Sequence, residues 1–196
     1  KKKDKINKKL TFINNLDVNT DYYRDKKKSL NIIISKSGNT LETISNANVL
    51  IKKKDKNIFI TENKNSYLKS LANQLKSEII EHKNFIGGRY SVLSEVGMLP
   101  AELMGLNEKK FKQLNYLIKN KNFINNLSYN VSDTLNLLKK GKFTSIILNY
   151  DERSKNFFRW YQQLIAESLG KKSKGILPII STMPKDNHSL MQLYLD

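Results

Sequence analysis

The sequence predicts an α/β fold with parallel sheets, in which helices cover both faces of the strands in a three-layer α/β/α arrangement. Short apolar segments alternate with longer amphipathic ones, which is the order that successive parallel β-α-β units require. The isoleucine run within residues 30–37 shows no alternation of polar and apolar residues. Such a run is typical of a strand that is buried on both faces of a sheet.

The first half of the chain supplies the elements of one such sheet. Each expected strand is a short run rich in Ile, Leu or Phe, and each expected helix brings apolar residues to one face. The expected strands are residues 10–16, 30–37, 57–62 and 77–82, and the expected helices are residues 40–54 and 66–75. This order indicates a parallel sheet whose crossovers are helices.

The second half begins with residues 85–105, which break the alternation and which we interpret as a junction between two lobes. Helical segments are expected from there to about residue 140, where Gly141 is the expected C-cap. The remaining expected elements are strands at residues 143–150 and 175–182, a helix at residues 154–171, and the start of a last helix from His188.

We therefore predict two domains, residues 1–90 and residues 91–196. The first lacks an N-terminal β-α unit, because its first expected strand begins almost at residue 10. The second stops within its last expected helix, at Asp196. A complete domain rarely begins and ends in the middle of its architecture, so we expect a fragment whose second lobe is incomplete.

Composition restricts the classes of function. The chain has 196 residues and no cysteine, which excludes disulfide scaffolds, thiolate zinc sites and cysteine nucleophiles. Two histidines, His82 and His188, argue against a transition-metal site. The apolar runs are too short to cross a bilayer. We therefore expect no metal, no cofactor, no membrane association and a cytoplasmic location.

The chain is strongly basic, with 35 Lys and Arg against 18 Asp and Glu, a net charge of +17. A basic surface can bind nucleic acid, acidic lipid or phosphorylated metabolites. A genome biased toward Lys, Asn and Ile codons would give the same charge without a binding role. The lysine runs are scattered and no aromatic residues alternate with them, so we expect no nucleic-acid partner.

The segment SKSGNTLET, residues 35–43, joins an expected buried strand to an expected helix. A helix N-terminus offers free N–H groups and a partial positive charge, which suit a phosphate. Gly38 permits close approach of the backbone, although neither the Walker nor the dinucleotide glycine pattern is present. Hydroxyls that could donate to phosphate oxygens come from Ser35, Ser37, Thr40 and Thr43. The alternative is an ordinary helix start with Thr40 as its N-cap.

Arg89 and His188 are candidates for electrostatic and proton-transfer roles. Arg89 follows Gly87 and Gly88 at the expected junction, where its guanidinium could stabilise an anionic intermediate; the alternative is a solvated arginine. His188 opens an expected helix, where it could shuttle protons or have no chemical role. His82 closes an expected strand, and we interpret it as structural.

Gln163 and Glu167 lie four positions apart and so share one helix face. Glu167 is expected at the edge of a buried surface, in the last turn of its helix. Partial burial and the helix dipole would both raise the pKa of its carboxyl group. A raised pKa suits a general base that removes a proton from carbon at neutral pH. The alternative is a surface glutamate paired with Lys171.

Taken together, these motifs resemble the glucose-6-phosphate isomerase (phosphoglucose isomerase) family, which is built from sugar isomerase (SIS) domains. The matching segments, in order, are SKSGNTLET at 35–43, GGRYSVLSEVGMLP at 87–100, QQLIAESLGK at 162–171 and DNHSLMQL at 186–193. The first form is shared by many SIS proteins, whereas the second and third are more specific to this family.

The resemblance implies a role for each candidate. Glu167 would be the base that moves a proton between C2 and C1, and Arg89, beside Gly88, would stabilise the enediolate. His188 would open the sugar ring from the neighbouring subunit, which implies a homodimer. Gln163 would bind substrate, and the family's phosphate contacts would fall to Ser35, Lys36, Ser37, Thr40 and Thr43.

The resemblance also implies an SIS-like fold and a metal-independent interconversion of glucose 6-phosphate and fructose 6-phosphate, in glycolysis and gluconeogenesis. The family's early Gly-Gly-Ser loop and its C-terminal ring-opening lysine do not occur in these residues. Two alternatives stay open. One is another SIS-type phosphosugar isomerase, and the other is a non-catalytic regulatory domain that binds a sugar phosphate.

Overall fold

The computed structural model describes residues 10–16, 29–107, 109–172 and 174–196. The chain divides into two compact units, Lys1–Lys112 and Gln113–Asp196. All strand pairs that form sheets are parallel, and helices connect them, which confirms the predicted α/β class with its SIS-like, three-layer character. The predicted division into domains at residue 90 stays a prediction, because compactness alone divides the chain after Lys112.

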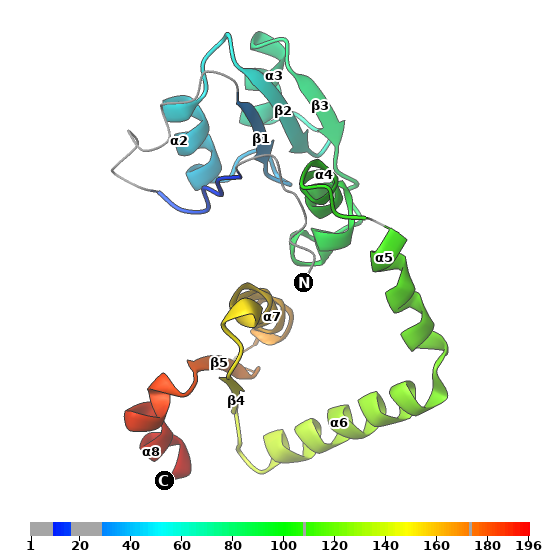
Figure 1. Ribbon diagram of the computed structural model, residues 1–196, viewed down its shortest axis with the longest axis vertical. Helices are drawn as coiled ribbons and strands as arrows, with labels where there is room; N and C mark the ends of the chain where they lie inside the picture. The colour runs from blue at the N-terminus through cyan, green and yellow to red at the C-terminus, as the bar shows by residue number, and fades with distance from the viewer. Residues whose placement is uncertain (1–9, 17–28, 108, 173) are drawn as a thin grey trace. The chain divides into compact units, whose positions relative to one another are not determined.

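Unit 1 is built on a three-stranded sheet in the order β1-β2-β3 (Figure 1). The strands are β1 (Leu30–Ile34), β2 (Lys56–Thr61) and β3 (Glu78–Glu81), and the connecting helices are α2 (Leu41–Leu50) and α3 (Tyr67–Gln74). Three predicted strands and both predicted helices of this half are thereby confirmed. Strands β1 and β3 and both helices are shorter than their predicted ranges, whereas β2 has the predicted length with its bounds shifted by one residue.

The core of unit 1 lies between one face of this sheet and both helices. Ile33 and Phe59 are register partners on β1 and β2, and both are buried. Ala47 of α2 and Leu68 of α3 pack against them in the same cluster. The two helices therefore share one face of the sheet. Ile60, on the alternate face, is also fully buried, which fits strands rich in isoleucine at successive positions.

The strand predicted at residues 10–16 is wrong, because these residues are exposed and form no strand. The Leu16 N–H bonds to the Asn15 Oδ1 at 2.8 Å, and the Asn15 carbonyl accepts a hydrogen bond from the Asn46 side chain at 3.1 Å. An apolar run forms a strand only where a neighbouring strand pairs with its backbone. Here side-chain amides take up these backbone groups instead.

After β3, unit 1 continues into the 3₁₀ helix η1 (Gly88–Leu93), helix α4 (Glu95–Leu103) and the short helix α5 (Lys109–Lys112). The predicted junction at residues 85–105 is thus an ordered turn and two helical segments. Ser94 caps α4, since its hydroxyl accepts a hydrogen bond from the Val96 N–H at 3.4 Å.

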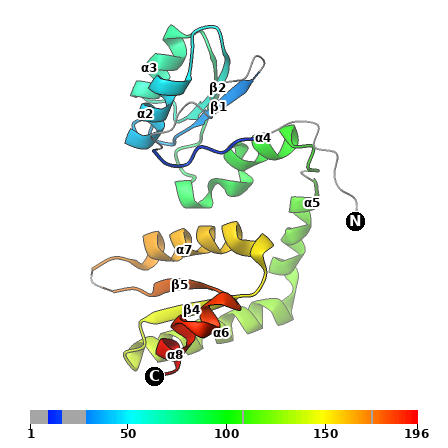
Figure 2. The same cartoon turned by 60° about the vertical axis from the view of Figure 1, so that its left-hand side comes forward.

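Unit 2 pairs two parallel strands, with helix α7 alongside them (Figure 2). Its elements are η2 (Gln113–Lys119), α6 (Lys121–Lys139), β4 (Thr144–Asn149), η3 (Glu152–Ser154), α7 (Lys155–Leu169), β5 (Leu177–Thr182), η4 (Lys185–His188) and α8 (Leu190–Leu195). The strands and helices predicted for this half are confirmed. Gly141 adopts φ +80° just after α6, as the predicted C-cap requires.

Helix α7 is half-buried along one face, which includes Trp160 and Leu164. The Gln162 amide donates to the Pro178 carbonyl at 2.8 Å, which ties the helix to β5. Within the described part of the chain, no helix is both long enough and apolar enough to span a membrane.

Candidate functional site

The candidate residues of unit 1 gather where its parallel strands end. Ser35 follows β1, Glu62 follows β2 and His82 follows β3, and all three are buried. Backbone hydrogen bonds continue past the strands, from the Glu62 N–H to the Lys36 carbonyl at 3.1 Å and from the His82 N–H to the Thr61 carbonyl at 2.9 Å. In open α/β sheets this carboxyl edge is where ligands bind.

The loop after β1, residues 35–40, is held rigidly by the N-terminus of α3. The Gly38 carbonyl accepts from the Leu68 N–H at 3.0 Å, and Asn39 Oδ1 accepts from the Tyr67 N–H at 2.9 Å. Gly38 has φ +67°, and a Cβ built there would lie 2.2 Å from the Ser66 Oγ. Only glycine therefore fits this position of the loop.

The loop hydroxyls form one connected group beside the N-terminus of α2. Ser35 Oγ and Thr40 Oγ1 are 2.8 Å apart, and Ser37 Oγ lies 3.5 Å from Thr40 Oγ1. Thr40 is the N-cap residue of α2, as the alternative of an ordinary helix start expected, but its side chain makes no capping hydrogen bond. Thr43 lies half-buried in the first turn of α2.

The Lys36 side chain turns away from the loop toward the segment after β3. Its ammonium donates to the Asn84 carbonyl at 2.9 Å and to the Ile86 carbonyl at 2.8 Å, and it lies 3.4 Å from Glu62 Oε1. An ammonium has three protons to donate. These three oxygens match that number, so Lys36 links the loop to residues 84–86.

Glu62 is a buried carboxylate that lies between two lysine side chains, Lys36 and Lys64. Its carboxylate pairs with Lys64 and Lys36, and the hydrogen bond from Lys64, followed by its charge and by Lys36, lowers the pKa of Glu62 despite the opposing effect of burial. Glu62 thus stays ionised and fixes the Lys36 ammonium beside the loop.

The turn that carries Gly88 and Arg89 is closed by local hydrogen bonds. The Tyr90 N–H donates to the Gly87 carbonyl at 2.9 Å, and the Ser91 hydroxyl donates to the Gly88 carbonyl at 2.6 Å. The Arg89 guanidinium carbon lies 4.8 Å from the centre of the Tyr90 ring. A Cβ on Gly88 would meet no atom of the described residues within 4 Å, apart from its own chain neighbours, so space is open beside this backbone.

In unit 2, Gln163 and Glu167 lie on the outer face of α7, and the Gln163 amide donates to Glu167 Oε1 at 2.8 Å. Their predicted shared face is confirmed. Both side chains are exposed, so unit 2 by itself does not supply the burial expected around Glu167. The amide fixes the position of the carboxylate along the helix.

His188 is exposed at the end of η4, and Asp186 anchors this short segment to β5. Asp186 Oδ2 accepts from the Ser181 hydroxyl at 2.6 Å and from the Thr182 N–H at 2.7 Å. These hydrogen bonds, the Ser181 one foremost, lower the pKa of Asp186. The sequence reading passed over Asp186, although its place two residues before His188 was a usable signal.

The structure thus brings the predicted residues together in two separate groups. Unit 1 groups the loop hydroxyls with Lys36, which reaches toward the Arg89 turn, while unit 2 pairs Gln163 with Glu167. Convergence of the two groups on one substrate stays a prediction. Among the residues that the structure describes, no three His, Asp or Glu side chains gather as metal ligands would.

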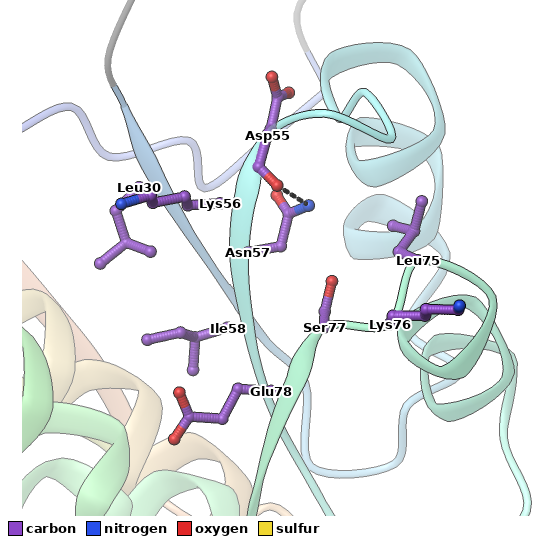
Figure 3. A pocket seen from close by; sticks show the side chains of 9 residues that line it. All are labelled: Leu30, Asp55, Lys56, Asn57, Ile58, Leu75, Lys76, Ser77 and Glu78. Atoms are coloured by element: carbon purple, nitrogen blue, oxygen red, sulfur yellow. Dashed lines mark hydrogen bonds between the residues drawn. The ribbon is translucent and has the colours of Figure 1, made fainter.

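A separate hollow of about 300 Å³ lies at the opposite, amino ends of the unit 1 strands (Figure 3). Asn57 lines it, and its side-chain amide donates to the Asp55 carbonyl at 3.1 Å. Its lining contains none of the predicted site residues.

Comparison with known proteins gives a consistent result. The family model described as phosphoglucose isomerase matches residues 1–176. A glucose-6-phosphate isomerase of Methanocaldococcus jannaschii is 36% identical over 97% of this chain and 51% of its own length. One from Mycoplasmopsis synoviae is 32% identical over 90% of this chain and 44% of its own. The chain spans about half the length of the curated relatives it matches.

A solved structure, a hypothetical protein of Thermus thermophilus, superposes with a TM-score of 0.69 at 25% identity. The match covers 85% of this chain and 44% of that one.

Proposed function

The chain belongs to the phosphoglucose isomerase family, and we propose that the whole protein interconverts glucose 6-phosphate and fructose 6-phosphate. The observation that carries the proposal is the loop after β1. Three hydroxyls meet there at the start of α2, and the one nearest the helix is not used as a cap. The names of the relatives and the other matched segments support the same reaction.

The phosphate of the substrate would bind at this loop. Ser35, Ser37 and Thr40 would donate hydroxyl hydrogen bonds, with Thr43 one turn further along α2. The first N–H groups of α2 would complete the contacts, because they lack partners within the helix. The charge of Lys36 would add attraction without leaving its carbonyl partners. This remote binding energy would hold the sugar in register for the chemistry.

The isomerisation needs one base and one fixed cation. Glu167 would remove the C2 proton to give an enediolate, and the resulting carboxylic acid would return that proton to C1. The hydroxyl proton of O2 would pass to O1, so that no atom is gained or lost. Arg89 would stabilise the developing oxyanion, and the open space at Gly88 would let the sugar backbone approach. Gln163 would bind substrate and orient the Glu167 carboxylate.

Ring opening would fall to His188, held in place by Asp186 and supplied by the neighbouring subunit of a homodimer. The substrate is a phosphosugar, so the proposed setting is glycolysis and gluconeogenesis in the cytoplasm. No metal or cofactor is required for a carboxylate and a guanidinium to perform this proton transfer.

The test replaces Glu167 by Gln in the whole protein, with Glu152→Gln as the matched control. Glu152 is an exposed glutamate of the same unit, and its partner is Lys155. We expect Glu167→Gln to lower turnover by about 10²–10⁴-fold, the usual contribution of a general base. Exchange of the C2 proton with solvent should fall equally, and Glu152→Gln should leave both rates unchanged.

Retained C2 exchange in Glu167→Gln would remove Glu167 from this role. Tight binding of the sugar phosphate without any turnover by the unaltered protein would instead favour a regulatory sugar-phosphate-binding domain.

A further inference from the structure

The carbonyl of Ile86 accepts two side-chain hydrogen bonds, each from a different strand end. Lys36, which follows β1, donates from Nζ at 2.8 Å, and His82, which follows β3, lies with Nε2 at 3.1 Å. A carbonyl oxygen can only accept, so Nε2 of His82 carries a proton. Lys36 and His82 therefore hold the same peptide group from two sides, two residues before Gly88.

The other ring nitrogen of His82 connects to the segment after the turn. Nδ1 of His82 pairs with the carboxyl group of Glu95, which opens α4. The imidazole is 1% exposed, so water does not reach its ring nitrogens to replace either partner. One ring thus joins the end of β3, the peptide before Gly88 and the first turn of α4 after Leu93.

The turn between these attachment points contains two consecutive glycines, Gly87 and Gly88. Local hydrogen bonds close this turn, but glycine gives the backbone more freedom than any other residue, so two glycines leave the turn more adaptable than its own hydrogen bonds alone would fix. Stabilisation of a developing oxyanion requires a donor that is already in place, and displacement by about 1 Å can cost on the order of 100-fold in rate. Arg89 would need support from outside the turn.

We propose that His82 is a positioning residue, which together with Lys36 and Glu95 fixes the Gly88–Arg89 turn for stabilisation of the enediolate. This inference rests on the proposed isomerase function. It assigns His82 to the chemical step and not to phosphate binding. The phosphate loop is held separately, by hydrogen bonds from the Leu68 and Tyr67 N–H groups of α3.

The test compares His82→Phe, which keeps the ring volume and loses both hydrogen bonds, with His82→Gln, which keeps a donor for Ile86. Asn57→Leu is the matched control. Asn57 is also buried and also has two side-chain hydrogen-bond partners, Asn31 and Asp55, but it lies at the amino end of the sheet. The Asn57→Leu variant tests whether a loss of stability in this unit is enough to impair catalysis.

In the whole protein, we expect His82→Phe to lower kcat by about 10–100-fold while KM changes by less than about twofold. His82→Gln should recover a substantial part of kcat, and Asn57→Leu should retain full kcat. A phosphorylated hydroxamate that mimics the enediolate should bind more weakly to His82→Phe. A phosphorylated sugar alcohol, which lacks the oxyanion, should bind as before.

Hydrogen–deuterium exchange separates this inference from the proposed function. Amides of residues 83–90 should exchange faster in His82→Phe, and those of residues 35–43 should not. Glu95→Ala, at a side chain that is 25% exposed, gives the same comparison if His82→Phe does not fold. An unchanged kcat, or a rise in KM as large as the fall in kcat, would overturn the inference. Absence of turnover in the unaltered protein would overturn only the proposed reaction. An exchange pattern that is unchanged in His82→Phe would still overturn the positioning role of His82.

Discussion

Replacement of Gly38 by Ala separates the two reasons for a glycine in the loop after β1. The backbone there has φ +67°, and the added Cβ would lie 2.2 Å from Ser66 Oγ and 2.9 Å from Thr61 Oγ1. The left-handed conformation costs about 1–2 kcal/mol for a residue with a Cβ. The clash adds about 1–3 kcal/mol, because Ser66 caps α3 and cannot move away without losing its hydrogen bond to the Lys69 N–H.

Gly105→Ala isolates the first of these costs within the same unit. Gly105 has φ +76°, but a Cβ there would meet nothing within 4 Å. Urea unfolding monitored by circular dichroism should show a loss of about 2–5 kcal/mol for Gly38→Ala and about 1–2 kcal/mol for Gly105→Ala. Equal losses for the two variants would refute the packing argument, because only Gly38 has a neighbour in contact.

Two further predictions concern the turn and the His188 segment. Gly88→Ala should leave the urea midpoint unchanged, since a Cβ at Gly88 meets no described atom within 4 Å apart from its chain neighbours. The same variant should lower isomerase activity in a steady-state assay, because the Cβ fills the open space beside Arg89. A lowered urea midpoint would contradict this prediction. Asp186→Asn should destabilise the protein at neutral pH. The folded pKa of Asp186 lies below its ordinary value, so its stabilising effect is present above that ordinary value and is lost as pH falls through the folded pKa. The difference in urea midpoint between the two forms should therefore shrink on acidification, and a constant difference would refute it.

The apolar pattern of a short segment was enough to predict those strands that pair with a neighbouring strand. The isoleucine run of β1 and the apolar runs of β4 and β5 became paired parallel strands. Residues 10–16 have a comparable apolar content but no paired strand in the described part of the chain. Their backbone groups form hydrogen bonds with side-chain amides instead. Strand formation depends on a partner, and a partner is not visible in a single segment.

The site residues divide in the same way. Ser35, Thr40 and Gly38 were predictable because a strand, a loop and a helix start follow one another within ten residues. The hydrogen bonds of the Lys36 side chain were not predictable, because its acceptors at Asn84 and Ile86 lie 48 and 50 residues further along the chain. The resemblance implied only that Lys36 belongs to the phosphate contacts, and its ammonium is shown by the structure to bind two backbone carbonyls.

This placement of Lys36 makes it the residue through which the two parts of the unit 1 site are coupled. Its backbone belongs to the phosphate loop, and its ammonium holds Ile86, just before the Gly88–Arg89 turn. The loop and the turn each have other supports that they do not share, from α3 for the loop and from His82 for the turn. In a hexose 6-phosphate a short carbon chain limits the separation between the phosphate and C1–C2, so a site that binds both must keep its two parts within that reach. Lys36 is placed to fix that separation, because its side chain spans from the loop to the segment before the turn while Glu62, at the end of β2, pairs with its ammonium.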